Sequence, residues 1–427
     1  MESGIPRRRG ASAASAMSAI LCAAVLSAAC GQTQPAAGPS QSAPVTITVW
    51  TRAATESHTK ALADAYNASH TNQVKVTAYP NEEYPAKIAT AAGGKNLPDL
   101  FASDVVFAPN YISQGLWQDV TDRFGALPFK DKVAPAHIKA ATQDGKTYAV
   151  PHTVDISVLF VNKELYKKAG LDPEKAPATL KEFAEQATTV RTKLGGKTYG
   201  TYFGGNCGGC DVFTLWPSVW AGGGEVMNAE GTQSTIDDPQ MAAVFDVYAK
   251  LYADGVAAPG SKEENGTTWL GALQAGTIGI APGPSVWLGL LEEKGIDVGV
   301  APIPGVDGGT STFVGGDVIG VSATSERAEA AWDFLSFTLS DKVQADLQAK
   351  SKSTVARTDL TATDPRVQAM NEIMATGRTP YALKFNESYN DLQSPWLKTL
   401  RAALFGTDPA GALKEGATAI TASLNQQ

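Results

Sequence analysis

Carboxylates and indole rings recur near turns of this 427-residue chain. Asp104 and Asp155 lie at or within strand-like segments. A carboxylate accepts hydrogen bonds from paired hydroxyl groups, and a flat aromatic ring stacks on the C–H face of a sugar ring. The combination predicts a site for a polyhydroxylated ligand, although each acid alone could be a helix N-cap and each tryptophan a hydrophobic plug. Six tryptophans stand beside glycine, proline or polar turn residues, namely Trp50, Trp216, Trp220, Trp269, Trp287 and Trp396.

Other polar side chains could complete such a site. Arg52 follows the first predicted strand, where it could pair with an anionic ligand group or orient Asp104. Asp317 follows two glycines and could either contact the ligand or stabilise a turn. Asn206 and His152 are weaker candidates. Arg52 leaves open a second ligand class, the glycerophosphodiesters.

Common catalytic signatures are absent from the sequence. The four histidines form no His-Glu-x-x-His motif, no Gly-x-Ser-x-Gly elbow occurs, and Arg191 stands where a phosphate-binding loop would need its first glycine. A glycosidase that uses Asp104 and Asp155 is an alternative that the sequence leaves undecided. Its carboxyl groups would have to lie about 5 to 9.5 Å apart, and a sequence gives no such distance. We predict a binding protein rather than an enzyme, with no cofactor and no metal.

Two cysteines, Cys207 and Cys210, lie among four glycines. A redox-active Cys-x-x-Cys pair normally follows a strand and opens a helix, and two sulfurs are too few for a closed zinc site. In an oxidising exterior they are expected to form a disulfide that clamps a mobile loop. The loop that it closes is so short that the bond should fix local shape more than global stability.

The N-terminal segment reads as an export signal over residues 1–29. Three arginines precede a small and apolar run over residues 11–26, and Ser27-Ala28-Ala29 stands directly before Cys30. This pattern is typical of a bacterial lipobox, whose cysteine is lipidated and becomes the new N-terminus. The apolar run is too short for a retained spanning helix, which needs about 20 residues. We therefore expect an extracytoplasmic protein anchored to the cell membrane by lipid on Cys30, with residues 30–44 as a disordered tether.

Charge and length limit the remaining possibilities. The formal net charge is -8, and the export signal is itself positive, so the rest of the chain is more acidic still. An acidic surface argues against nucleic acid or an anionic membrane face as partner. The part after the signal is too long for one core, which predicts two lobes with a cleft between them.

The pattern of elements predicts an α/β fold. Strands are expected at residues 45–50, 74–79 and 98–102, with helices at residues 56–69 and 85–92 between them. Such alternation predicts a mainly parallel sheet flanked by helices, with the ligand at the carboxyl ends of the strands. Further on, the chain carries a long β-rich run from Tyr148 that could cross between lobes, strands at 277–281, 297–301 and 312–321, and one helix at 326–350.

Four stretches together resemble a known family. They are Ile47–Thr51, Leu97–Asp104, Gly145–Leu165, and Gly279–Ser285 followed by Phe313–Gly316. In order and spacing they are similar to the extracellular solute-binding proteins of carbohydrate ABC importers, the family of maltose-binding protein. The resemblance implies two lobes, a periplasmic-binding-protein-like fold of type II, that close on a carbohydrate and present it to a membrane permease. We also expect the protein to be a monomer.

The resemblance also implies lobe boundaries and ligand contacts. The solute-binding domain would span residues 45–427, with one lobe at about 45–153 and 312–350 and the other at about 154–311 and 351–427. Ser103 and Asp104 match the polar loop after the third strand, and Asp155 matches a sugar-contacting acid. Ser285 takes a position where the family commonly has an aromatic residue, and Trp287 follows two residues later. The predicted contacts are therefore Trp50, Arg52, Ser103, Asp104, Asp155, Asn206, Trp216, Trp269, Ser285, Trp287, Gly316, Asp317 and Trp396.

Overall fold

The computed structural model describes residues 43–80 and 83–426. The predicted export signal, the lipidation of Cys30 and almost all of the predicted tether lie outside these residues. Residues 44–427 form one compact unit. Within the described residues, no helix is both long enough and apolar enough to cross a membrane.

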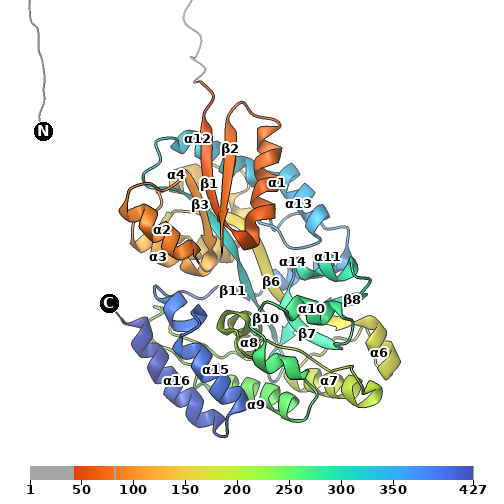
Figure 1. The fold of residues 1–427 in the computed structure, drawn as a ribbon. Coiled ribbons are helices and arrows are strands. Elements are labelled where there is room, and N and C mark those ends of the chain that lie inside the picture. The colour runs from red at the N-terminus through yellow and green to blue at the C-terminus, as the bar shows by residue number, and fades with distance from the viewer. Residues whose placement is uncertain (1–42, 81–82, 427) are drawn as a thin grey trace, which may run out of the picture. The chain divides into compact units, whose positions relative to one another are not determined.

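The first group of strands forms a mixed sheet (Figure 1). Strand β1 (Thr46–Arg52) pairs in parallel with β2 (Gln73–Tyr79) and β3 (Leu100–Asp104). Ile47 and Val49 are fully buried on one face of β1, as their alternation with threonines predicts. The long strand β10 (Thr310–Val321) then pairs antiparallel with β3. The prediction of a parallel sheet is therefore confirmed for β1 to β3, and the later strands add antiparallel pairs.

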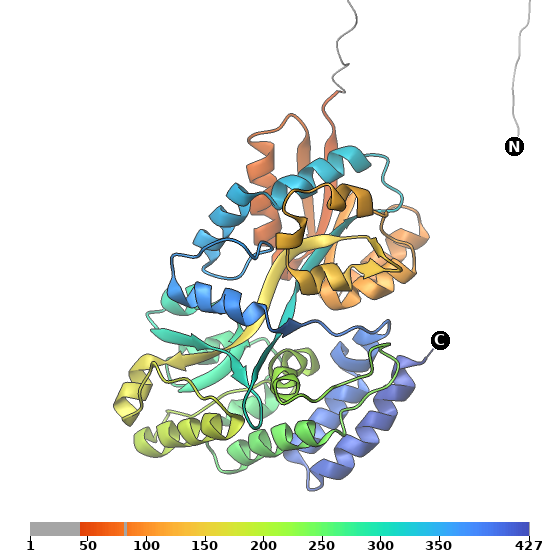
Figure 2. The same cartoon turned by 180° about the vertical axis from the view of Figure 1, so that it is seen from behind.

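Two long strands join the two lobes. Strand β6 (Val150–Asn162) pairs with β10 from Val150 to Ile156, and its later residues pair antiparallel with β7 (Ile280–Pro284) and β8 (Val298–Ala301). Both strands run from the group around β1 to the group around β7 (Figures 1 and 2). The β-rich run from Tyr148 thus crosses between lobes, as the sequence predicts.

Helices cover both groups of strands. Around the first group lie α1 (Glu56–Asn67), α2 (Tyr84–Gly93), α3 (Ala108–Ser113), α4 (Thr121–Gly125), α5 (Pro135–Ala140), α12 (Ala328–Thr338) and α13 (Asp341–Ser351). Around the second group lie α6 (Lys163–Ala169), α7 (Leu180–Leu194), α8 (Gly208–Ala221), α9 (Pro239–Ala253), α10 (Trp269–Gln274), α11 (Trp287–Glu292), α14 (Pro365–Met374), α15 (Pro395–Phe405) and α16 (Pro409–Leu424). Short strands β4 (Thr142–Gln143), β5 (Lys146–Thr147), β9 (Ile303–Pro304) and β11 (Gly377–Arg378) and the short helices η1 (Ala53–Thr55), η2 (Val105–Phe107), η3 (Lys130–Lys132), η4 (Pro259–Glu263) and η5 (Asn386–Asn390) complete the described elements.

Two local predictions were wrong. The helix predicted at 326–350 is interrupted, because Ser340 has an extended backbone and Asp341 opens a new helix with an acid in its first turn. The Cys207–Cys210 segment is not a loop, since Cys207 is the N-cap of α8. Helix α8 buries Leu215 and Val219, and it packs on β10, so packing outweighs the glycines at its start and Pro217 within it.

Candidate functional site

A cleft of about 760 Å³ lies where β6 and β10 cross between the two strand groups. Its volume falls in the range of about 300 to 1,000 Å³ that is usual for small-ligand sites. The first lobe contributes the end of β1 and the end of β3, and the second contributes the start of α8 and helices α10 and α11. The segment 351–356, which follows α13, forms a further part of the wall. Both lobes therefore contribute to one ligand-sized space.

Arg52 is held between two carboxylates on the first-lobe side of the cleft. Its Nη1 lies 3.3 Å from Oδ2 of Asp104, and its Nε donates to Oδ2 of Asp317 at 3.3 Å. Its Nη2 also pairs with Oδ1 of Asp317, and Thr55 donates to the same carboxylate at 2.9 Å. Two acids thus neutralise the single charge of Arg52, which leaves little positive potential for an anionic ligand.

The pKa values of the two acids that contact Arg52 shift in opposite directions. Burial raises the pKa of Asp104, and the charge of Arg52 opposes this only in part. For the fully buried Asp317, burial also acts to raise the pKa, but the charge and hydrogen bonds of Arg52 outweigh it and lower the pKa. Asp317 is therefore the firm ionic partner of Arg52, while Asp104 faces the cleft.

Asp155 has no cationic partner among the described residues at ion-pair distance. Its Oδ1 accepts a hydrogen bond from the Ser285 hydroxyl at 2.6 Å and from the Val286 N–H at 3.3 Å. Burial raises the pKa of Asp155 to about 6, although these hydrogen bonds favour the charged form. Its position halfway along β6, opposite Gly315 of β10, places the carboxylate in the cleft at the crossing point. Such a carboxylate can accept hydrogen bonds from ligand hydroxyls.

The pKa of Asp155 predicts a pH dependence of stability in the ligand-free protein. Because the pKa is higher in the folded chain than in the unfolded chain, the unfolded chain loses this proton first as pH rises. Wild type should therefore lose up to about 3 kcal/mol relative to Asp155→Asn as pH rises from about 4 to about 7.5. Urea unfolding of both proteins at the two pH values measures this difference. A stability difference that stays constant between the two pH values would contradict the assignment.

Two histidines, His58 and His152, line the cleft. His152 is buried, and burial lowers its pKa to about 3, while burial also lowers the pKa of His58. The His58 Nε2 lies 2.9 Å from the carbonyl oxygen of His152, and the Thr59 hydroxyl lies 2.8 Å from the His152 Nε2. Both rings therefore help to shape the cleft wall without adding charge.

Aromatic rings line the second-lobe side of the cleft. Trp269 and Trp287 pack edge to face with ring centroids 5.8 Å apart, and both line the cleft. Trp269 is largely buried, whereas Trp287 is partly exposed. Phe213, Phe313 and Phe385 also line the space. We call the pair Trp269 and Trp287 the indole wall.

Comparison with known proteins identifies the family. A family described as "Bacterial extracellular solute-binding protein" matches residues 61–376. The chain belongs to this family. Its members are binding proteins rather than enzymes, so the glycosidase hypothesis built on Asp104 and Asp155 loses its support. The fold and the recognition from sequence are confirmed.

The proteins to which this chain is similar are named for different ligands. The chain is 27% identical over 391 residues to the diacetylchitobiose binding protein DasA of Streptomyces coelicolor, covering 87% of this chain and 88% of that one. It is 24% identical over 222 residues to the sn-glycerol-3-phosphate-binding periplasmic protein UgpB of Brucella melitensis, covering 49% and 48%. The structure is similar to a cyclic alpha-maltosyl-1,6-maltose binding protein from Arthrobacter globiformis, with a TM-score of 0.75, 25% identity, and coverage of 89% and 99%.

Not all residues predicted to contact ligand line the cleft of this solute-binding protein. Arg52, Asp104, Asp155, Trp269, Trp287 and Gly316 do so. Ser285 and Asp317 lie one layer behind, where they hydrogen-bond Asp155 and Arg52. The six lining residues stay in the proposed site, and these two are assigned a supporting position.

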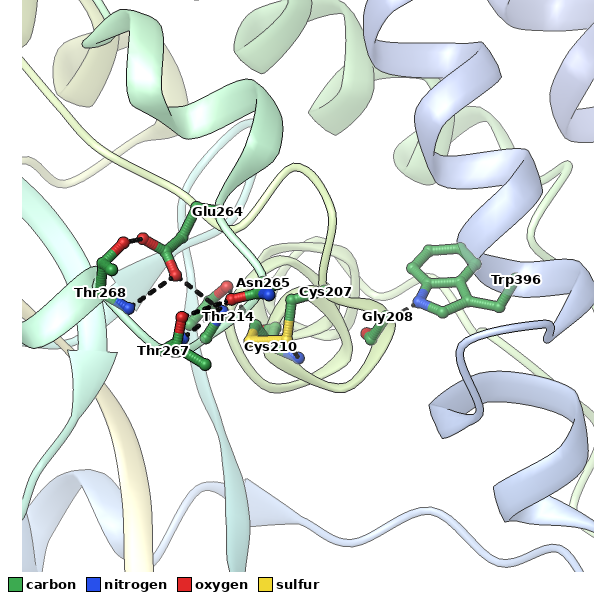
Figure 3. The surroundings of a disulfide bond; sticks show 10 residues. Cys207, Gly208, Cys210, Thr214, Glu264, Asn265, Thr267, Thr268 and Trp396 are labelled. Carbon is green, nitrogen blue, oxygen red and sulfur yellow. Dashed lines mark hydrogen bonds between the residues drawn. A yellow bond between two sulfur atoms is a disulfide. The ribbon is translucent and has the colours of Figure 1, made fainter. Parts of the chain in front are cut away.

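The remaining predicted contacts lie away from the cleft. Trp216 and Trp396 are fully buried in the second-lobe core with ring centroids 5.7 Å apart. The Trp396 Nε1 donates to the carbonyl oxygen of Gly208 at 3.0 Å (Figure 3). Core packing rather than ligand stacking therefore accounts for these two rings, and we remove both from the site. Of the other candidates, Trp50 packs on Tyr79, Ser103 is buried, and the Asn206 N–H donates to the Glu264 carbonyl.

Several cleft residues carry no clear sequence signal. Phe213 and Cys210 reach the cleft from the first turns of α8, whose helical character the glycine content hides. Thr354 lies in a segment without periodicity, and its hydroxyl donates to the carbonyl oxygen of Val154 on the crossing strand at 3.0 Å. For helix α8, the Cys-x-x-Cys pair was the one sequence feature that could have indicated a helix, because such pairs often open one.

Proposed function

We propose that this protein is the substrate-binding component of an ABC importer and captures an oligosaccharide between its lobes. The observation that carries the proposal is the cleft itself, where the Asp155 carboxylate and the indole wall line the same ligand-sized space. A carboxylate supplies acceptors for hydroxyl pairs, and indole rings supply apolar faces for sugar rings. The names of relatives such as DasA support a carbohydrate ligand.

Capture requires a change in lobe arrangement rather than chemistry. Strands β6 and β10 join the lobes at Asp155 and Gly316, so a small change of backbone angle there would move one lobe against the other. A ligand that contacts Asp104 in the first lobe and the indole wall in the second favours the closed form. Only in the closed form can it make both sets of contacts. The closed form would then be the one that a membrane permease recognises.

The charges in the cleft favour a neutral ligand over a glycerophosphodiester. Arg52 is the one arginine or lysine among the described cleft-lining residues, and Asp104 and Asp317 already neutralise it. Asp155 adds a further acid without a cationic partner in the described part of the chain. A phosphate group would meet net negative potential, so this alternative is less favourable despite the similarity to UgpB.

A thermal-shift screen separates the two ligand classes. A ligand at 100 times its dissociation constant stabilises the folded protein by about 2.7 kcal/mol. We expect a rise in unfolding temperature with at least one neutral oligosaccharide and none with glycerol 3-phosphate or glycerophosphocholine. The opposite pattern would assign the cleft to phosphodiesters.

We further infer that the protein is exported and tethered by lipid on Cys30, as the sequence pattern predicts. A Cys30→Ser variant should leave the membrane fraction and appear in the medium or the periplasmic extract, because it lacks the acceptor thiol. Immunoblotting of cell fractions measures this distribution. Retention of the variant in the membrane fraction would instead indicate an uncleaved anchor. A monomer is the expected state, with the permease as its protein partner.

A further inference from the structure

The disulfide Cys207–Cys210 closes the first turn of α8 beside the cleft. Cys207 is the N-cap of the helix, and its sulfur accepts a hydrogen bond from the Cys210 N–H at 3.2 Å. Cys210 itself lines the cleft, and both cysteines are half-buried. The bond therefore belongs to the wall of the ligand site.

A turn at residues 264–268 packs directly on this disulfide (Figure 3). A Cβ on Gly266 would lie 3.1 Å from the Cys210 sulfur and 3.4 Å from the Cys207 sulfur. A Cβ on Gly204 would lie 3.0 Å from the Cys210 Cβ and 3.1 Å from the Trp269 ring. The two glycines thus allow the disulfide, the turn and the Trp269 indole to pack without space between them.

Glu264 fixes the shape of the same turn from its other side. Residue Glu264 is 2% exposed, and its carboxylate accepts hydrogen bonds from the Gly266 N–H at 2.7 Å, the Thr268 N–H at 3.1 Å and the Tyr202 hydroxyl at 2.8 Å. The Thr268 hydroxyl also donates to it (Figure 3). Trp269 follows directly as the first residue of α10. Four hydrogen bonds to the Glu264 carboxylate therefore fix the backbone of the turn directly before Trp269.

We propose that the Cys207–Cys210 disulfide and Glu264 are positioning groups for the indole wall, and that reduction of the disulfide lowers ligand affinity. The disulfide acts on the Gly266 turn, the turn orients Trp269, and Trp269 packs on Trp287. The effect on affinity rests on the proposed sugar-binding function. The effect on the two indoles does not depend on any ligand.

The redox step balances with an external dithiol. One thiolate of dithiothreitol attacks a sulfur of the disulfide and forms a mixed disulfide, and its second thiol then displaces the protein sulfur. Two protein thiols and one cyclic disulfide result, with two electrons transferred to the protein. Once the bond is broken, the Cys210 side chain can rotate away from Gly266, and the turn loses the surface on which it packs.

Fluorine NMR of fluorotryptophan-labelled protein tests the positioning directly. The fragment 32–427 keeps the compact unit whole and has Cys207 and Cys210 as its two cysteines. Trp269→Phe and Trp287→Phe variants assign the two resonances. Reduction, verified by thiol titration, should shift both, while the Trp332 resonance on α12 stays in place. Unchanged resonances of Trp269 and Trp287 in the fully reduced protein would overturn the proposal.

Matched variants separate positioning from general stability. Glu264→Gln should shift the same two resonances with the disulfide intact, whereas Glu263→Gln should not, since Glu263 is exposed and pairs with Arg401. The Cys207→Ser/Cys210→Ser variant should resemble the reduced protein and ignore dithiothreitol. A Glu264→Gln spectrum identical to that of Glu263→Gln would remove Glu264 from the proposal.

Calorimetry with N,N′-diacetylchitobiose tests the consequence for binding. We expect the reduced protein to bind about tenfold more weakly than the oxidised one, with full recovery on reoxidation. Equal affinity of both forms would overturn the redox effect. Absence of binding in both forms would count against this sugar as ligand, and the NMR result would still decide whether the disulfide positions the indoles.

Discussion

Replacing Asp155 with alanine will weaken sugar binding by about 100-fold and leave the fold intact. The carboxylate accepts hydrogen bonds from Ser285 and Val286 through one oxygen, Oδ1. Asp155 also lines the cleft, where ligand hydroxyls can donate to its carboxylate. Hydrogen bonds to a charged group contribute about 1.5 to 3 kcal/mol each, so losing one or two gives this decrease.

Calorimetric titration of wild type and Asp155→Ala with the same sugar measures the loss. Glu293→Ala is a suitable control, because it removes an exposed acid at the end of α11 in the same lobe. The unfolding temperature of Asp155→Ala should not fall, since the variant removes a buried charge without a cationic partner in the described structure. An unchanged dissociation constant would exclude Asp155 from the site.

Replacing Gly316 with alanine will destabilise the protein by about 3 kcal/mol or more. Gly316 has a φ of +102°, a conformation that residues with a Cβ rarely adopt. A Cβ at this position would also lie 2.2 Å from the carbonyl oxygen of Thr153 on the neighbouring strand. The backbone of β6 or β10 must therefore shift at the point where both strands cross between lobes.

Urea unfolding of Gly316→Ala and Gly115→Ala separates the cost of the positive φ from the cost of the close approach to Thr153. Gly115 has a φ of +67° and open space around its missing Cβ. Its substitution should therefore cost only the backbone strain of about 1 kcal/mol. If Gly316→Ala is no less stable than Gly115→Ala, the close approach to Thr153 has no energetic consequence. A shift in sugar affinity of the Gly316 variant would further implicate this position in lobe movement.

Local patterns in the sequence predict much of the fold. Alternating apolar residues identify β1, because its period-two burial is visible without any tertiary information, and the long β-rich run from Tyr148 identifies the crossing strand β6, which is buried over most of its length. Helix α8 was missed, since glycines and Pro217 indicate a loop, and only packing against β10 compensates for them. The sequence does contain a local signal for the break before α13, because Ser340 is a common type of helix N-cap residue and an acid follows it.

The candidate site was predicted in part. Asp104, Asp155, Trp269 and Trp287 could be found because acids at or within strand segments and tryptophans near turns are unusual enough to notice. Trp216 and Trp396 could not be told from them, since an indole ring fits a core and a sugar site equally well. The pairing of Arg52 with Asp317 joins residues 265 positions apart, and no local pattern reports such a contact.

Calorimetric titration of the fragment 32–427 against neutral mono- and oligosaccharides, with product analysis of each mixture, tests the proposed function most directly. We predict that one oligosaccharide binds with micromolar or tighter affinity and is recovered unchanged. Binding of a glycerophosphodiester without any neutral sugar, or recovery of a cleaved sugar, would contradict the assignment of this cleft to sugar capture.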